Sequence, residues 1–104
     1  MPNIQPIPGH VYKVKKNNQT PDPWPVNVED IPSDASVTVV LTQGNEKWKG
    51  KLNKSTTPPQ IEFDGVLGPG TPTDGTALIQ VTITRPLQGP VTTDRGNFDI
   101  EVEI

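Results

Sequence analysis

The final stretch of the sequence, Phe98–Ile104, alternates strictly between apolar and acidic residues. Because successive side chains of a β-strand point to opposite faces, this run has one apolar face and one charged face. It predicts a half-buried strand, and its apolar face needs other strands to cover it. The rest of the chain must therefore supply those strands.

The remaining sequence has the features of short strands and no helical period. Thirteen prolines among 104 residues exclude long helices, since proline breaks the helical hydrogen-bond ladder. A hydrophobic content of 31% limits the core to a thin layer, as between two small sheets. Runs of β-prone residues between turn signals predict strands within His10–Lys16, Val26–Val28, Ser36–Leu52, Gln60–Leu67, Thr76–Thr84 and Phe98–Ile104.

The segment Ser36–Leu52 predicts a β-hairpin with a defined register. Gly44-Asn45 suits a two-residue type II′ turn, which favours glycine first. With the turn placed there, Leu41 faces Trp48, Val39 faces Gly50 and Val37 faces Leu52. On the other face, three lysines lie opposite Thr42, Val40 and Thr38: Lys47, Lys49 and Lys51. Turn chemistry and apolar pattern agree, as expected of a real hairpin.

These strands predict an all-β fold, an antiparallel immunoglobulin-like β-sandwich of six or seven strands, with a small barrel as the alternative. Residues 1–9 hold three prolines and are predicted as an extended Pro-rich N-terminal arm, or an edge β segment, free for a partner. Residues 10–104 are predicted to form a single β-sandwich domain. The basic His10–Lys16 strand is predicted to neighbour the acidic face of Phe98–Ile104.

Charge and composition narrow the classes of partner. Twelve acidic and nine basic residues give a net charge of −3, which provides no general attraction to nucleic acid or anionic membranes. Without cysteine, neither a disulfide nor a thiolate metal site can form. No apolar run approaches the length of a transmembrane helix, and Met1–Gln5 lacks the basic and apolar regions of a signal peptide.

Catalytic chemistry has few candidate residues. His10 is the sole histidine, and the serines lie outside any Gly-x-Ser-x-Gly nucleophile motif. Two carboxylates, Glu62 and Asp64, share one strand face, but nothing in the sequence of so small a domain indicates the cleft that a pair of catalytic carboxylates needs. We expect no enzyme activity, no cofactor and no metal site, with loop carboxylates that bind calcium as an open alternative.

Two features are candidate partner-binding sites. Trp24 lies between Pro23 and Pro25, where a rigidly presented indole could stack on a sugar or anchor a protein; the alternative is that it closes one end of the core. The outward stripe of Lys47, Lys49 and Lys51 could contact a polyanion, or could protect an exposed strand from pairing with another chain. Trp48, on the opposite face, is predicted to belong to the core.

Two segments resemble parts of known families. Val37–Leu52, with its Gln43-Gly44-Asn45 turn, resembles a hairpin of bacteriophage baseplate and tail sandwich domains. The closing Asn97–Ile104 strand is similar to the last strand of immunoglobulin-like domains, although their characteristic cysteine pair is absent. Together these segments cover about half the chain.

The resemblance implies a non-enzymatic virion module in a phage tail, baseplate or head decoration, or a surface adhesion module. Such a module acts by protein–protein assembly with copies of itself or with other subunits. Its location would be a virion or cell surface, and otherwise the cytoplasm. The alternative function is a carbohydrate-binding module that uses Trp24, with Tyr12 as a second stacking ring and a glycan as partner. Neither function involves nucleic acid or membrane insertion.

Overall fold

A computed structural model describes residues 3–15, 19–68, 72–93 and 96–103. This part of the chain is all β, as predicted, and contains neither a helix nor any segment of the kind that spans a bilayer as a helix. Its strands are β1 (Asn3–Pro6), β2 (Tyr12–Lys15), β3 (Trp24–Glu29), β4 (Ser36–Gln43), β5 (Glu46–Asn53), β6 (Gln60–Gly68), β7 (Gly75–Thr84), β8 (Val91–Thr92) and β9 (Gly96–Glu103).

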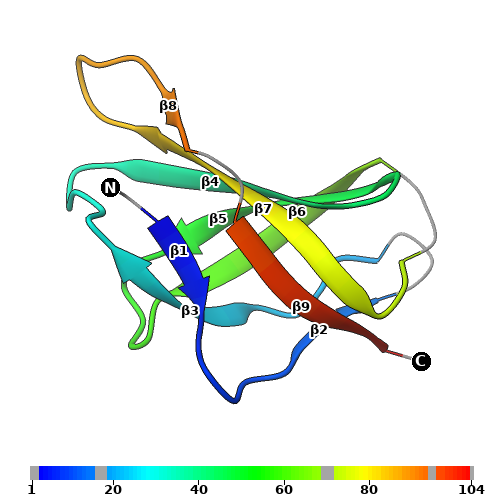
Figure 1. Cartoon of the computed structure of the whole chain (residues 1–104). Coiled ribbons are helices and arrows are strands. Elements are labelled where there is room, and N and C mark those ends of the chain that lie inside the picture. Colours follow the sequence, from blue (N-terminus) through cyan, green and yellow to red (C-terminus); the bar gives the residue numbers. More distant parts are fainter. Residues whose placement is uncertain (1–2, 16–18, 69–71, 94–95, 104) are drawn as a thin grey trace.

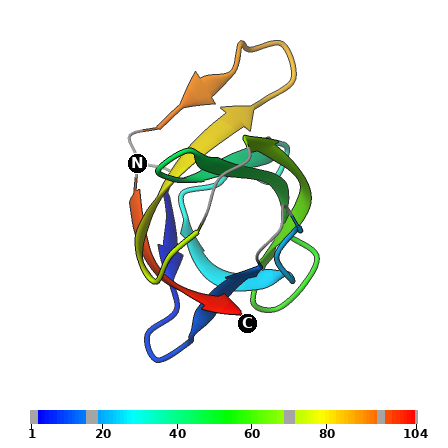
Figure 2. The same ribbon diagram turned by 90° about the vertical axis from the view of Figure 1, so that its right-hand side faces the viewer.

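The strands form one curled sheet. Hydrogen-bonded neighbours follow the order β1-β3-β6-β5-β4-β7-β9-β2, and β8 adds to β7. The sheet bends until β1 packs beside β9, and Figure 2 shows the resulting ring. The predicted antiparallel immunoglobulin-like sandwich of six or seven strands is not confirmed, because nine described strands form a single sheet and β2 pairs with β9 in parallel. Two irregularities in the β5–β6 ladder, between Lys47 and Trp48 and between Lys49 and Gly50, give the extra bend and twist that such curling needs.

The β4–β5 hairpin has the predicted register. Leu41 pairs with Trp48, Val39 with Gly50 and Val40 with Lys49. Gly44, the first turn residue, has a φ of 58°, as a type II′ turn requires. The hairpin is central in the sheet, between β6 and β7 (Figure 1).

The N-terminal segment joins both ends of the sheet path. β1 pairs antiparallel with β3, and β2 pairs with β9 in the one parallel pairing of the described strands. Lys13 lies opposite Glu101 and Lys15 opposite Glu103, which confirms the predicted neighbours. Over its described residues, the expected arm is the edge β segment and not a free extension, because Ile4 is buried in the core. Residues 1–2, Lys16 and Ile104 lie outside the described residues.

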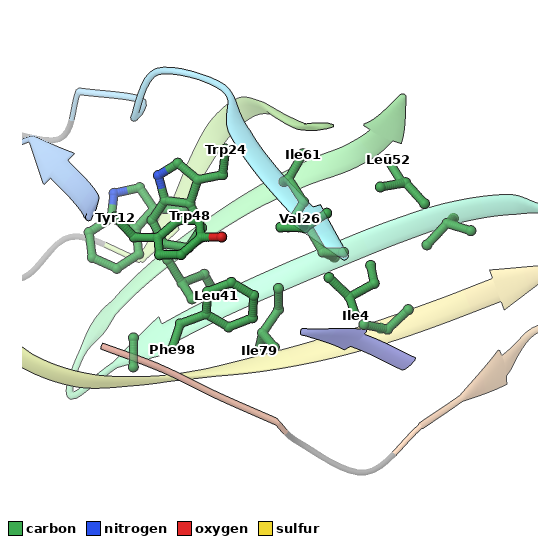
Figure 3. Packing of buried hydrophobic residues seen from close by; sticks show 14 of the residues in the cluster. Ile4, Tyr12, Trp24, Val26, Leu41, Trp48, Leu52, Ile61, Ile79 and Phe98 are labelled. Atoms are coloured by element: carbon green, nitrogen blue, oxygen red, sulfur yellow. The ribbon is translucent and has the colours of Figure 1, made fainter. Parts of the chain in front are cut away.

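The aromatic side chains occupy one end of the core, and aliphatic ones such as Ile4 and Leu52 the other (Figure 3). Trp48, Leu41 and Phe98 are buried, so the prediction that Trp48 belongs to the core is confirmed. On β7, the predicted inward face is also correct, with three buried residues: Ile79, Val81 and Ile83.

Candidate functional site

Trp24 is part of the core and is not a surface platform. Its side chain is only 2% exposed, and its indole N–H donates to the backbone carbonyl of Lys13 at 3.1 Å. The ring packs on Tyr12 and Phe98, with centroids 5.0 and 5.5 Å away. β3 begins at Trp24, earlier than the predicted Val26–Val28 strand. This burial agrees with the alternative in which Trp24 closes one end of the core, and it contradicts the stacking role, since a buried ring offers no face to a sugar.

Tyr12 joins β2 to the neighbouring strand β3 by its hydroxyl. The hydroxyl accepts a hydrogen bond from the Ile7 backbone N–H at 2.8 Å and donates to the Pro25 carbonyl at 2.7 Å. The Tyr12 hydroxyl and the Trp24 indole thus link β2 to β3 by side-chain hydrogen bonds, which help to close the ring of strands. Burial raises the pKa of the Tyr12 phenol above its ordinary 10.0, and the hydrogen bond from Ile7 lowers it in part.

This raised pKa predicts a loss of stability at high pH. The folded state favours the neutral phenol. The contribution of Tyr12 to the free energy of unfolding is therefore fully present below pH 10.0 and is lost as pH rises through the raised pKa. Urea unfolding between about pH 8 and about pH 11 should show a steeper decline for wild type than for Tyr12→Phe. The variant should start about 1–3 kcal/mol less stable, because it leaves the Pro25 carbonyl and the Ile7 N–H unpaired. Parallel pH curves would contradict this role.

The lysine stripe is on the outer surface of β5, as predicted, but neighbouring acidic side chains lower the net positive charge of this surface. Lys47, Lys49 and Lys51 are exposed. Lys51 pairs across the ladder with Glu62, and the Lys49 ammonium lies 3.9 Å from the Asp64 carboxylate. The stripe is thus an outward face beside two acids, a poor electrostatic match for a polyanion.

His10 lines two depressions of about 170 and 330 Å³ at the outer side of β2 and β9. The larger contains Asp74, Asp99 and Glu101, but no serine is among its lining residues. Asp74 already accepts a hydrogen bond from the Val102 N–H at 2.7 Å, and Asp99 from the Thr76 hydroxyl at 3.3 Å. Within the described residues, no group of three or more His, Asp or Glu side chains could hold a metal ion.

The most distinctive surface feature is the hairpin made by β7, β8 and their connection, which projects from the body of the molecule (Figure 1). Every residue from Arg85 to Thr92 is exposed. Leu87 is fully exposed, and Val91 is 59% exposed. These are two of only four large apolar side chains exposed among the described residues.

Leu87 has a backbone conformation that favours glycine. Its φ is 62°, and the Gln88 N–H donates to the Arg85 carbonyl at 3.2 Å, which closes a turn with Pro86 at its second position. A type II turn has this form and normally has glycine where Leu87 stands. The other such turn, Ile7–His10, has Gly9 at that position, with a φ of 82°. The left-handed conformation costs a leucine about 1–2 kcal/mol.

The base of the hairpin is held in place by several contacts. The Arg85 guanidinium binds the Asp34 carboxylate through two hydrogen bonds of 3.1 and 3.3 Å. The hydroxyls of Thr82 and Thr92 are 3.2 Å apart, and the Thr93 N–H donates to the Val81 carbonyl at 2.9 Å. The tip is therefore presented from a fixed base. In the sequence, the neighbours Pro86, Gly89 and Pro90 indicate a turn at Leu87 but not the exposure of its side chain.

A shallow depression of about 270 Å³ lies on the outer face of β4, β5 and β6. Its apolar lining includes Val40 and the exposed Leu67. Lys49, Lys51 and Asp64 also line it. The molecule thus has a projecting apolar tip and, on another part of its surface, a depression that is lined in part by apolar side chains.

Comparison with known proteins gives no relative: no family model, no curated protein and no solved structure matches this chain.

Proposed function

We propose that the protein is a non-enzymatic structural module that binds protein subunits through the projecting β7–β8 hairpin, with Leu87 as the anchor. The observation that carries the proposal is a fully exposed leucine in a left-handed turn position. A conformation that costs free energy and has no compensating burial within the chain suggests selection for binding. Full burial of an exposed leucine side chain at an interface would contribute about 1.5–3 kcal/mol.

The partner that we propose is a second copy of the chain. Leu87 of one copy would enter the depression beside Leu67 of the next. Such a contact joins two different surfaces, so it would be repeated from copy to copy and would give a ring or a filament. This behaviour suits the assembly role that the resemblance to phage structural domains implies. The virion setting and the immunoglobulin-like relationship stay predictions of that resemblance.

Substitution of either contact should weaken self-association. Leu87→Asn is expected to keep the fold, because asparagine tolerates the left-handed conformation, and to weaken association at least about tenfold. Leu67→Asn, which changes the depression that would receive Leu87, should weaken association to a similar extent. Sedimentation velocity at rising concentration measures both. Val11→Asn is the matched control, since Val11 is similarly exposed, at 52%, but lies on neither surface.

A wild-type protein that stays monomeric up to about 1 mM would overturn self-assembly, because an association free energy of about −4 kcal/mol would be visible there. Equal weakening by Val11→Asn would show that association depends on exposed apolar area in general and not on this contact.

The carbohydrate-binding alternative has no comparable support. Both of its expected stacking rings, Trp24 and Tyr12, are buried to 2% exposure.

A further inference from the structure

Two polar side chains are buried in the ring without a hydrogen-bond partner. Glu46 and Trp48 follow each other on the inward face of β5, and each has 0% exposure. Among the residues that the structure describes, neither carboxylate oxygen of Glu46 nor the indole nitrogen of Trp48 has a partner. Buried polar groups are almost always paired, so three unpaired atoms within three residues need an explanation.

Among the described residues, three polar side chains close to Glu46 or Trp48 have other partners. Gln43 lies directly opposite Glu46 in the ladder. However, its side-chain amide donates to the Thr73 carbonyl at 2.7 Å and accepts from the Thr73 N–H at 2.8 Å. The Tyr12 hydroxyl and the Trp24 indole, which share the aromatic end of the core (Figure 3), have backbone partners as well.

The regular alternation of β5 places both side chains on its inward face. The register of β5 against β6 shifts between Lys47 and Trp48, and again between Lys49 and Gly50. Such irregularities re-aim side chains and are common beside binding sites. An inward glutamate also departs from the apolar pattern of this strand face, which otherwise continues with Trp48, Gly50 and Leu52.

The unpaired atoms define the chemistry of the missing partner. It must donate hydrogen bonds to Glu46 and accept one from the Trp48 N–H. A bare cation cannot accept from the indole, and an anion would be repelled by the carboxylate. Neither residue lines any of the three depressions described above. Water is the small molecule that donates and accepts at once and commonly bridges buried polar groups.

We propose that Glu46 and Trp48 form an internal hydration site, where one ordered water or a short chain of waters bridges the carboxylate and the indole N–H. This site is separate from the hairpin and does not depend on the proposed assembly function.

NMR of the wild-type protein tests the site directly, because the two indole protons serve as probe and control. Water-selective NOESY and ROESY spectra should show a cross-peak between water and the Trp48 indole proton, with the signs of a long-lived internal water. The Trp24 indole proton should show none, since it donates to the Lys13 carbonyl. Trp48→Phe assigns the two signals.

Two substitutions at Glu46 extend the test. Glu46→Gln keeps groups that bind water and should retain the cross-peak, whereas Glu46→Leu should abolish it. Absence of the wild-type cross-peak, an equal one at Trp24, or a crystal structure with a protein N–H on the Glu46 carboxylate would each overturn the proposal. The wild-type spectra decide the question even if Glu46→Leu fails to fold.

Discussion

Trp24→Ala is expected to lower the free energy of unfolding by about 3–5 kcal/mol, enough to unfold a marginally stable small domain. The substitution removes a ring that packs on Tyr12, Phe63 and Phe98 with centroids 5.0–5.5 Å away. It also removes the indole bond to the Lys13 carbonyl, one of two side-chain hydrogen bonds described between β2 and β3. The ring of strands would then be weakened at its closure.

Urea denaturation followed by circular dichroism measures the effect of Trp24→Ala. Trp24→Phe separates the two contributions, because it keeps an aromatic ring and loses only the indole bond and some volume. Val91→Ala, at an exposed position, should stay within about 0.5 kcal/mol of wild type. A cost below about 1 kcal/mol for Trp24→Ala would show that the ring is not part of the core.

Gly50→Ala is expected to cost about 1–3 kcal/mol through steric overlap with the neighbouring strand. A Cβ atom at Gly50 would lie 2.7 Å from the Glu62 carbonyl oxygen and 3.0 Å from the Phe63 Cα. Both atoms belong to the backbone of β6, which cannot move aside as a flexible side chain can. The overlap falls beside an irregularity in the β5–β6 ladder, so amide chemical shifts along β6 should change as well.

Gly89→Ala is the matched control, because nothing lies within 4 Å of a Cβ atom at Gly89. Where a glycine has an ordinary conformation and free space, alanine stabilises a protein slightly by restricting the unfolded chain. Gly50→Ala should therefore lower the urea midpoint, whereas Gly89→Ala should leave it unchanged or raise it slightly. Equal effects would mean that the close approach of β5 and β6 at Gly50 is absent in solution.

Two of the strand pairings could be predicted from the sequence, whereas the closure of the sheet could not. The β4–β5 register follows from Gly44-Asn45 and the alternation of Leu41 and Val39, which are local signals. The β2–β9 pairing was predictable from opposite charges on two strand faces. A period-two pattern shows which side is buried, but not whether the covering strands form a second sheet or continue round in the same one.

The candidate sites were harder to predict from the sequence than the strand pairings. Proline-flanked Trp24 fits a surface loop and a strand start equally well, and only the tertiary contact with Lys13 decides between them. The exposure of Leu87 depends on how far the hairpin projects, which no local pattern specifies. Glu46 did give a signal, because the predicted hairpin register places it on the same face as Trp48. A charged residue on an apolar face was the one visible indication of the hydration site.

The parallel pairing of β2 with β9 has a consequence for how the chain folds during its synthesis. Tyr12 and its ladder partner Ile100 are far apart in sequence, so their contact requires closure of a very long loop. A ribosome that adds about 5–20 residues per second exposes β2 for several seconds before β9 exists. The central hairpin can form meanwhile, but the ring cannot close. We therefore expect slow folding, typical of all-β domains with long-range contacts, and an early intermediate with unpaired strand edges.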